Sequence, residues 1–259
     1  MSYVVITGAS SGIGLGAAYA FAKRGENLIL AARRKEALEA LRGELLSLYP
    51  SLSVLSYAVD LRVQEDLKTF FDWTRDKAVH LWINSAGRGY RGKSLDLKVE
   101  DLEELLQLNV MSVASLSHLF VQNAQANAAL INVASSMGYQ FTAQASLYSA
   151  SKFFITSLTE GLYEEMKQDP RKLKIKLYCP SAVKTNFSFV AGGLKEADYE
   201  KVFSRFHTKE EAGEHLYTLY QSEAMLGLVD VKTYEFKLLP PQHPTFQAHQ
   251  YDKEKSTLL

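Results

Sequence analysis

Apolar and polar positions follow two alternating patterns from the start of the chain to about residue 180. Short apolar stretches rich in β-branched residues predict strands, and longer segments with apolar residues every three or four positions predict helices. We expect strands at 3–6, 27–32, 53–59, 80–84, 130–134 and 174–179, and helices at 13–24, 35–48, 64–77, 99–123 and 147–167. Strands and helices that alternate in this way favour right-handed crossovers and a parallel sheet covered by helices on both faces.

This pattern contains no linker, internal repeat or low-complexity segment, so one domain is the simplest interpretation. We predict an α/β fold over residues 1–240, with a Rossmann-type doubly wound parallel sheet of about seven strands. After residue 180 the rhythm loosens: 186–212 is a candidate substrate lid, 210–223 a further helix and 229–238 the last strand. Three prolines then open a polar C-terminal tail, 241–259, which we expect to be poorly ordered unless it packs on a partner.

Composition and charge argue against several classes of function. The 259 residues carry 29 Lys plus Arg and 29 Asp plus Glu, so no overall basic field exists to attract nucleic acid or an anionic membrane. The one cysteine, Cys179, lies in an apolar run and predicts a buried, inert thiol. No signal peptide is evident, and no stretch approaches the roughly 20 apolar residues of a membrane span. We expect a cytoplasmic protein with no nucleic-acid, membrane or metal partner.

A glycine-rich turn from Thr7 to Gly14 joins the first predicted strand to the first helix. Binding of a dinucleotide needs backbone N–H groups at a helix N-terminus and small residues where the backbone approaches the pyrophosphate. Gly8, Gly12 and Gly14 provide this, and with them the candidate cofactor contacts in the turn are Ser10, Ser11 and Ile13. The alternative is a tight strand–helix turn with a serine N-cap, but the position at the head of a strand–helix series favours a phosphate site.

The end of the second predicted strand carries two arginines, Arg33 and Arg34, and no acidic residue before Glu36. In dinucleotide-binding folds this position meets the adenosine ribose, where an acidic residue binds a free 2′-hydroxyl and a basic residue binds a 2′-phosphate. We therefore predict NADP(H) rather than NAD(H) as the cofactor. The alternative is a solvated pair of arginines that opens a helix.

Two further strand ends carry candidate contacts to adenosine. Asp60, followed by Leu61, comes after the third strand, where its carboxylate could accept a hydrogen bond from the adenine amino group or cap a helix. Asn84, Ala86 and Gly87 follow the fourth strand, where small residues would let the backbone lie against the adenine ribose.

Candidate catalytic residues are Tyr148 and Lys152, four residues apart on one face of a predicted helix. A free tyrosine has a pKa of about 10, and a neighbouring ammonium lowers that pKa toward the range useful for general acid–base catalysis. Ser135 follows the fifth strand, at the sheet edge where ligands bind, and could donate a hydrogen bond to a substrate oxygen. Asn109 could hold a water that links Lys152 to solvent, or it could satisfy the backbone of a kinked helix.

Together these residues resemble the short-chain dehydrogenase/reductase family over 3–187. The resemblance implies that Asp60 contacts adenine and that Pro180, Val183 and Thr185, in a Pro-Gly-x-Val-x-Thr motif, bind the nicotinamide carboxamide. It also implies a catalytic tetrad, which falls on Asn109, Ser135, Tyr148 and Lys152.

Three positions depart from the pattern of this family. Ser85 stands where the family has the second Asn of Asn-Asn-Ala-Gly, and Ser181 stands where it has Gly after the proline. Ser11 replaces a basic residue that many NADP-dependent members have, so a 2′-phosphate would depend on Arg33 and Arg34. None of these changes removes a group that transfers a proton or binds the pyrophosphate.

The mechanism implied by the resemblance is a hydride transfer. Ser135 and Tyr148 hydrogen-bond the substrate carbonyl, the nicotinamide delivers its pro-S hydride, and Tyr148 protonates the alkoxide. Lys152 lowers the pKa of the phenol, binds the nicotinamide ribose and passes protons through a water near Asn109. We predict an NADPH-dependent carbonyl reductase/alcohol dehydrogenase that transfers a hydride between the nicotinamide and a small-molecule ketone, aldehyde or secondary alcohol. The family's dimer and tetramer faces imply a homodimer or homotetramer.

Two alternative functions use part of the same motifs. A non-catalytic NADP(H)-binding regulatory or scaffold protein would need the glycine turn alone, and a sugar-nucleotide epimerase usually has a larger C-terminal domain and another glycine spacing. The substrate is expected to be partly hydrophobic, since apolar residues follow Ser135 and Thr185, namely Met137, Tyr139, Phe141, Phe187, Phe189, Val190, Tyr199, Val202, Phe203 and Phe206.

Overall fold

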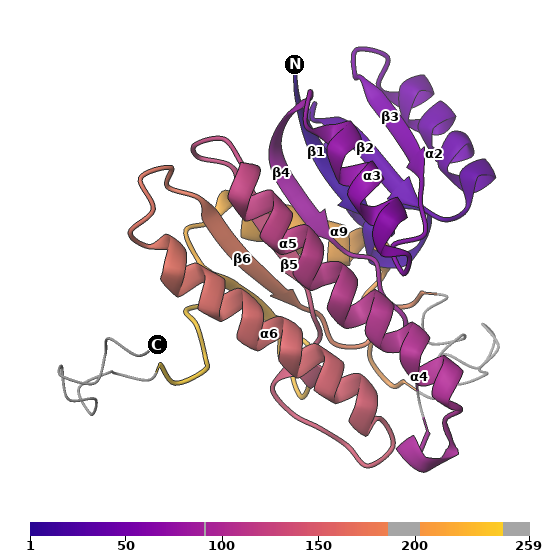
Figure 1. Ribbon diagram of the computed structural model, residues 1–259, viewed down its shortest axis with the longest axis vertical. Coiled ribbons are helices and arrows are strands. Elements are labelled where there is room, and N and C mark those ends of the chain that lie inside the picture. The colour runs from indigo at the N-terminus through magenta and orange to yellow at the C-terminus, as the bar shows by residue number, and fades with distance from the viewer. Residues whose placement is uncertain (91, 186–202, 246–259) are drawn as a thin grey trace.

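The computed structural model describes residues 1–90, 92–185 and 203–245. Its eight strands form one sheet in the order β3-β2-β1-β4-β5-β6-β7-β8 (Figure 1). All neighbouring strands pair in parallel except β7 and β8, which form an antiparallel hairpin. The strands are β1 Ser2–Thr7, β2 Asn27–Ala32, β3 Val54–Ala58, β4 Ala78–Asn84, β5 Ala129–Val133, β6 Lys174–Cys179, β7 Leu226–Val229 and β8 Phe236–Leu239.

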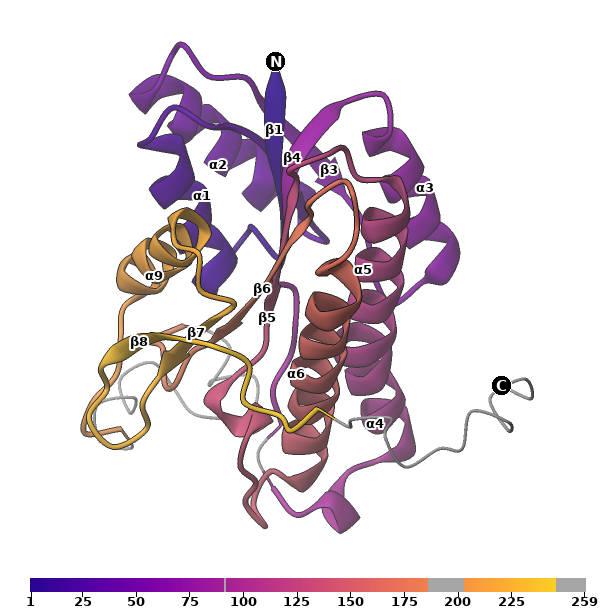
Figure 2. The same ribbon diagram turned by 90° about the vertical axis from the view of Figure 1, so that its left-hand side faces the viewer.

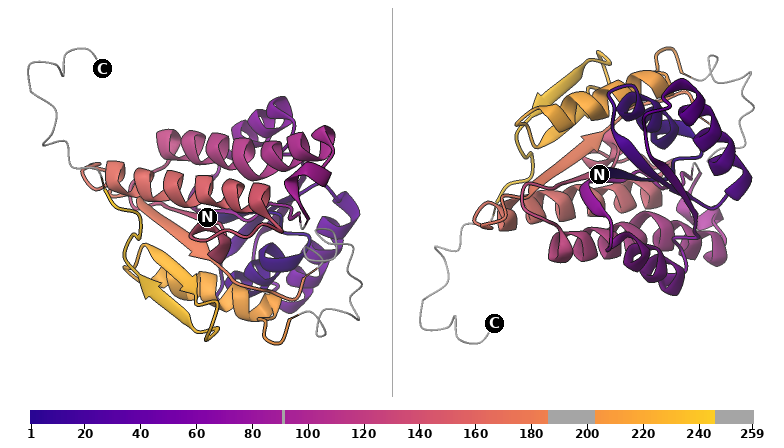
Figure 3. Two further views of the ribbon diagram at one scale, coloured as in Figure 1. Left: turned by 90° about the horizontal axis from the view of Figure 1, so that it is seen from below. Right: turned by 90° about the horizontal axis from the view of Figure 1, so that it is seen from above.

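Helices cover both faces of this sheet (Figures 2 and 3). The first face carries α1 Gly12–Ala22, α2 Lys35–Leu48 and α9 Lys209–Gln221, and the second carries α3 Gln64–Thr74, α4 Val99–Leu106, α5 Ser112–Asn123 and α6 Ser146–Met166. Three short helical turns complete the fold, η1 Ser94–Asp96, η2 Gln107–Met111 and η3 Ser136–Gly138. The predicted single-domain, doubly wound α/β fold is confirmed.

Side chains of the central strands fill a core on each side of the sheet, because successive residues of a strand point to opposite faces. Val4 and Ile6 of β1 pack with α1, α2 and α9, whereas Val5 between them packs with α3 and α5. Since both faces are covered, these strands are apolar at nearly every position, as is typical of a parallel sheet. The helices that cover both faces leave the carboxyl ends of β1, β4, β5 and β6 free. The loops that follow these strands can build a site there.

The C-terminal part differs from the prediction in its strands. The predicted last strand at 229–238 is wrong, because this range holds the end of β7, a turn and the start of β8. Asp230 makes the turn: its Oδ1 accepts hydrogen bonds from the backbone N–H groups of Lys232 (2.8 Å) and Thr233 (3.0 Å). Tyr234, although not a glycine, then adopts a positive φ of 62°. The turn therefore contains no glycine or proline by which the sequence would have indicated it.

The predicted helix over 99–123 is one continuous helical segment that contains a π-helical turn, η2. By length and apolar composition this segment could cross a membrane, contrary to the expectation that none could. Half of its most apolar window is nevertheless buried within the protein, and core helices of soluble proteins pass the same test.

The start of the predicted C-terminal tail does not extend away from the domain. Residues 240–245 run from β8 back to α6 (Figure 2), where Gln242 and His243 hydrogen-bond to Glu160. Most of the candidate lid, 186–202, and the rest of the tail, 246–259, lie outside the described residues.

Candidate active site

A cavity of about 960 Å³ opens at the carboxyl ends of the parallel strands. Its walls come from the turns that follow β1, β2, β4, β5 and β6, together with α6 and the β7–β8 turn. Most of the predicted site residues line it, namely Gly8, Ser10, Ser11, Gly12, Ile13, Arg33, Arg34, Leu61, Ala86, Gly87, Ser135, Tyr148, Lys152, Pro180, Val183 and Thr185. Residues far apart in the sequence thus meet in one cleft, as a dinucleotide and a substrate require.

The glycine turn has the shape of a phosphate cradle. Gly8 has a φ of +69°, and a Cβ there would lie 2.8 Å from the Cα of Ala86. A Cβ on Gly14 would lie 2.5 Å from the carbonyl oxygen of Gly8, so this residue, which does not line the cavity, keeps the turn closed. Ser11 precedes α1, but its side chain makes no capping hydrogen bond. The backbone N–H groups of the first helical turn, which have no intrahelical partner, are therefore left for a ligand.

Arg33 and Arg34 lie exposed on the cavity wall at the end of β2. The Nη2 atom of Arg34 donates hydrogen bonds to the backbone oxygen (3.1 Å) and to Oγ (3.2 Å) of Ser10, which holds this guanidinium beside the glycine turn. No carboxylate among the described residues forms an ion pair with either arginine. Two cations next to a pyrophosphate cradle fit the adenosine 2′-phosphate of NADP(H).

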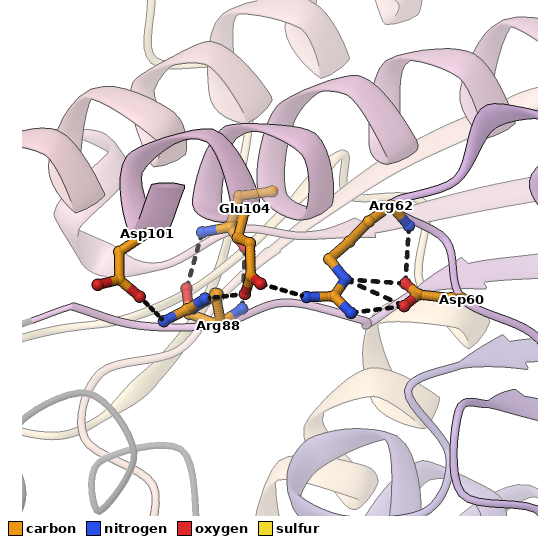
Figure 4. Close-up of polar contacts among 6 residues, drawn as sticks. Asp60, Arg62, Arg88, Asp101 and Glu104 are labelled. Carbon is orange, nitrogen blue, oxygen red and sulfur yellow. Dashed lines mark hydrogen bonds and ion pairs between the residues drawn. The ribbon is translucent and has the colours of Figure 1, made fainter. Parts of the chain in front are cut away.

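The carboxylate of Asp60 is held by Arg62 outside the cavity lining, so its contact with adenine stays a prediction. This carboxylate pairs with Arg62 at 2.6 Å, accepts the backbone N–H of Arg62, and is absent from the cavity lining (Figure 4). It does not cap α3 either, since the N-cap position is Val63. The hydrogen bond from Arg62 lowers the pKa of the Asp60 carboxyl. The next residue, Leu61, does line the cavity as expected.

Figure 4 shows that this ion pair belongs to a chain of charges that runs from Asp60 to Asp101 and Glu104 of α4. Arg62 pairs with Glu104 at 2.8 Å, Glu104 pairs with Arg88 at 2.5 Å, and Arg88 lies 3.6 Å from Asp101. Arg62, Arg88 and Glu104 all line the cavity and were missed by sequence reasoning. Glu104 is distant in sequence from both arginines that it pairs with. Only the short spacing between Asp60 and Arg62 could have suggested part of this row of ion pairs.

Asn84 braces the sheet rather than the cofactor site. Its side chain is 2% exposed and does not line the cavity, which corrects the prediction of a cofactor contact. Oδ1 accepts a hydrogen bond from Trp82 Nε1 (2.8 Å), and Nδ2 donates to Asn132 Oδ1 on β5 (2.9 Å). The backbone after it is held instead by Thr7, whose Oγ1 accepts the N–H groups of Ser85 and Ala86 at 3.1 Å each.

The three proposed catalytic side chains meet at the cavity wall. Tyr148 and Lys152 project from the same face of α6, with Lys152 Nζ 5.8 Å from the centre of the Tyr148 ring. Ser135, at the N-cap of η3, forms a hydrogen bond with the phenol of Tyr148. Hydroxyl, phenol and ammonium thus share one part of the cavity, as the sequence predicted.

The electrostatics of this group differ from the expectation. Burial raises the pKa of Tyr148 to about 12, although the hydrogen bond with Ser135 acts in the opposite direction. Burial also lowers the pKa of Lys152 to about 8, and its Nζ donates to the carbonyl oxygen of Val133 at 3.3 Å. The predicted lowering of the tyrosine pKa by the ammonium is wrong for this structure: burial of the phenol dominates, and the group that acts to lower the pKa is Ser135 rather than Lys152.

Asn109 lies in the π-helical turn η2 and anchors the loop after β4. Its Oδ1 accepts the backbone N–H of Arg88 (2.9 Å), and its Nδ2 donates to the backbone oxygen of Arg88 (2.8 Å) and to Ser151 Oγ (3.2 Å). The amide therefore does not satisfy the backbone of its own helix, which was one of the two interpretations. A water between Asn109 and Lys152 stays a prediction.

The segment after β6 closes the cavity against the glycine turn. A Cβ on Gly12 would lie 3.3 Å from the Cγ2 of Thr185, so the two segments are in close contact. Val183 forms a parallel bridge with His207, and Pro180 accepts the backbone N–H of Ser136 at 2.8 Å.

The remaining wall is largely apolar, with Gln140 and Thr142 as polar residues in the same loop. Met137 and Phe141 line the cavity as predicted, but Tyr139 between them does not. Phe203 also lines it, whereas Phe206 does not; the other five apolar residues expected after Thr185 lie outside the described residues. Val231 and Tyr234, on the β7–β8 turn, line the cavity and were not predicted, because the turn itself was not.

Comparison with known proteins identifies the class. A family model described as short chain dehydrogenase matches residues 2–190, which carry every strand from β1 to β6 and the three proposed catalytic side chains. The chain belongs to the short-chain dehydrogenase/reductase family and is an oxidoreductase of that family.

Individual relatives share this fold over most of their length. The dehydrogenase/reductase SDR family member 11 of Bos taurus is 28% identical over 211 residues, 78% of this chain and 81% of the relative. Carbonyl reductase family member 4 of Danio rerio is 26% identical over 229 residues, 87% of this chain and 93% of the relative.

Solved structures give the same picture. A short-chain dehydrogenase from Sphingobium yanoikuyae in complex with NADPH superposes with a TM-score of 0.80 at 27% identity, covering 90% of this chain and 89% of that chain. A short-chain dehydrogenase/reductase from Burkholderia phymatum in complex with NAD has the same fold, with a TM-score of 0.77 at 24% identity over 87% and 88% of the two chains. Nicotinamide cofactors of both kinds therefore occur in the family.

Proposed function

We propose that this protein is an NADPH-dependent carbonyl reductase. The observation that carries the proposal is the arrangement of the cavity: Arg33 and Arg34 stand beside the phosphate cradle, and Ser135, Tyr148 and Lys152 meet at another part of the same wall. A non-catalytic NADP(H)-binding protein would need the cradle and the arginines but not the three catalytic side chains together.

The chain's own residues supply the acid chemistry of a reduction. A substrate carbonyl oxygen placed between Ser135 and Tyr148 would accept hydrogen bonds from both hydroxyls, which stabilise the negative charge that develops there. With a pKa of about 12, Tyr148 stays protonated at neutral pH and is ready to donate its proton to the alkoxide. Lys152, charged below about pH 8, stabilises the phenolate that results. Bound NADPH would supply the hydride.

The preference for NADPH rests on the two arginines, since a 2′-phosphate needs cations at the end of β2. Arg62, the next cation on this wall, is already paired with Asp60 and Glu104. We expect Arg33→Asp to reverse the ratio of the NADPH and NADH efficiencies, measured as kcat/KM with one carbonyl substrate. Arg42→Asp on α2, outside the cavity, is the matched control. An unchanged ratio in the Arg33 variant would refute the assignment.

The substrate class is inferred from the apolar wall. Met137 and Phe141 come from the loop after β5, and Phe203, Val231 and Tyr234 from the segments around α9 and the hairpin. These residues favour a ketone or aldehyde with a bulky uncharged group. The test is oxidation of NADPH, followed at 340 nm, against ketones, aldehydes, quinones, steroids and ketoacyl thioesters. Turnover of bulky apolar carbonyls supports the proposal; tight NADPH binding with no turnover of any of them would favour the non-catalytic alternative.

A further inference from the structure

Glu160 is a buried carboxylate that the proposed reaction does not use. It lies on α6 and is 4% exposed. Its two oxygens accept hydrogen bonds from the phenol of Tyr139 and from the backbone N–H groups of Gln242 (3.0 Å to each oxygen) and His243 (2.7 Å). No cation among the described residues pairs with it. A carboxyl group buried in this way needs hydrogen-bond donors fixed around its oxygens.

These donors come from two segments that are about a hundred residues apart. Tyr139 belongs to the loop that follows β5 and η3, and Gln242 and His243 belong to the segment 240–245 that crosses from β8 to α6 (Figure 2). One carboxylate on α6 thus ties the catalytic loop and the C-terminal segment together.

The side chain of His243 makes a second connection between the same two segments. Its ring lies 5.1 Å from the ring of Tyr139, centre to centre, and its Nε2 lies 3.0 Å from Thr156 Oγ1. Thr156 Oγ1 in turn lies within donating distance of two carbonyl oxygens, that of Gly138 in the loop (3.0 Å) and that of Phe153 in its own helix (2.9 Å), which share its one proton. In the tautomer with a proton on Nε2, His243 donates to Thr156 and Thr156 donates to the loop.

The loop held in this way carries the active site on its other side. Met137 and Phe141 line the cavity, while Tyr139 between them turns to Glu160. A Cβ on Gly138 would lie 2.4 Å from Thr156 Cγ2 and 2.9 Å from the backbone oxygen of Lys152, so the loop rests directly on the α6 turn between these residues. The loop begins at Ser135, whose Oγ accepts the N–H of Met137 at 3.1 Å.

We propose that residues 240–245 form a C-terminal strap that holds the catalytic loop, residues 135–142, against α6 through Glu160 and His243. Glu160 and His243 are then positioning residues: they touch neither substrate nor cofactor and act through Tyr139 and Thr156 on Ser135. The effect of the strap on turnover rests on the proposed carbonyl reductase function, whereas its effect on the order of the loop does not.

Two truncations of the full chain test the order of the loop independently of activity. The first ends after Leu239 and removes the strap; the second ends after Thr245 and keeps it. We expect amide hydrogen exchange in peptides covering 135–142 to be at least about tenfold faster in the first than in the second, with β1 and α1 unchanged. Equal exchange of the loop in both truncations overturns the proposal, whether that exchange is as slow as in the whole chain or faster.

Point variants test the catalytic consequence. We expect Glu160→Ala and His243→Ala to lower kcat about tenfold, with the dissociation constant of NADPH within twofold of the wild type, because only the group at Ser135 is displaced. Glu160→Gln, which keeps an acceptor for the strap, should recover part of kcat. Ile175→Val on β6, a core change of modest cost, controls for loss of stability and should keep kcat.

The outcomes separate the two claims. Faster exchange of the loop without any carbonyl reduction by the wild type supports the strap and refutes the proposed function. Normal exchange and normal kcat in the Glu160 and His243 variants refute the strap and leave the proposed function standing. A loss of NADPH binding as large as the loss of kcat would show general unfolding and also contradict the positioning role.

Discussion

The two sides of the cavity are built by different means. On the N-terminal side, residues 2–133, most of the cavity wall comes from the short turns after parallel strands, and the glycine turn closes on the backbone of Ala86. On the C-terminal side, residues 203–245, a hairpin, a cluster of imidazole and aromatic rings and the strap are joined by side chains to distant segments. The first side is mainly a backbone scaffold, to which the ion pairs from Asp60 to Arg88 are added, whereas the second depends on individual side-chain contacts.

This difference indicates where each side can change. On the N-terminal side, little besides glycine fits where backbone meets backbone, so substitutions there should be costly at a few positions and neutral elsewhere. On the C-terminal side, several contacts of moderate strength each contribute to stability. Single substitutions there should therefore have intermediate and pH-dependent effects on stability.

The largest effect on stability is expected where the two sides meet, at the crossing of α1 and α9. A Cβ on Gly16 would lie 1.8 Å from the carbonyl oxygen of Lys209, and one on Gly213 would lie 2.3 Å from that of Gly16. We expect Gly16→Ala to lower the free energy of unfolding by about 3 kcal/mol, because the helices must separate. Gly43→Ala on α2, where a Cβ meets nothing within 4 Å, should raise it by about 0.5–1 kcal/mol. Urea denaturation compares them; equal effects would mean that the crossing is not tight.

A second prediction uses the ring cluster of the C-terminal side. His215 stacks on Phe236 with ring centres 4.3 Å apart, lies beside His207 and Glu211, and has Nδ1 3.1 Å from the phenol of Tyr178. Burial, with a smaller contribution from His207, lowers the pKa of His215 to about 4. In the unfolded chain its pKa is about 6.5, so between pH 6.5 and 4 the unfolded state binds a proton that the folded state does not.

The free energy of unfolding should therefore fall by about 2 kcal/mol as the pH drops from 6.5 to 4. In His215→Phe this decrease should be clearly smaller, and in His118→Gln, at an exposed position on α5, it should be unchanged. Denaturation at several pH values measures the slopes. If the free energy of unfolding depends on pH in the same way in the wild type and in His215→Phe, His215 does not cause this dependence.

The smallest effect is expected at the start of α9. Thr208 and Glu211 form a capping box: Thr208 Oγ1 accepts the N–H of Glu211 (3.1 Å), and Glu211 Oε2 accepts the N–H of Thr208 (2.7 Å). We expect Thr208→Ala to lower the free energy of unfolding by about 1 kcal/mol. Thr218→Ala, exposed within the same helix, should change it by less than about 0.5 kcal/mol. If both variants lose the same stability, the cap contributes nothing specific.

How far the fold could be predicted follows the same division. The strands at 27–32 and 174–179 and the helix at 35–48 have the predicted bounds, because apolar periodicity marks buried elements clearly. The β7–β8 hairpin was missed, since its turn depends on the Asp230 side chain and on a tyrosine with positive φ. The docked strap was missed because Glu160 and residues 242–243 show no local sign of their contact.

For the site, local motifs located Ser135, Tyr148 and Lys152 correctly, because each follows from its place at a strand end or on one helix face. The pairing of Arg62 with Glu104 could not be foreseen, since Glu104 comes from a helix some forty residues later; only the pairing of Arg62 with Asp60 is local. The raised pKa of Tyr148 depends on burial by several segments, which a sequence does not display.

The most direct test of the account is Tyr148→Phe, with kcat for NADPH oxidation and the dissociation constant of NADPH measured on the same preparation. The account predicts that kcat falls about a thousandfold or more, since the proton donor is lost, while NADPH binds within about threefold of the wild type. Turnover within tenfold of the wild type would show that another group donates the proton and would contradict the assignment of Tyr148.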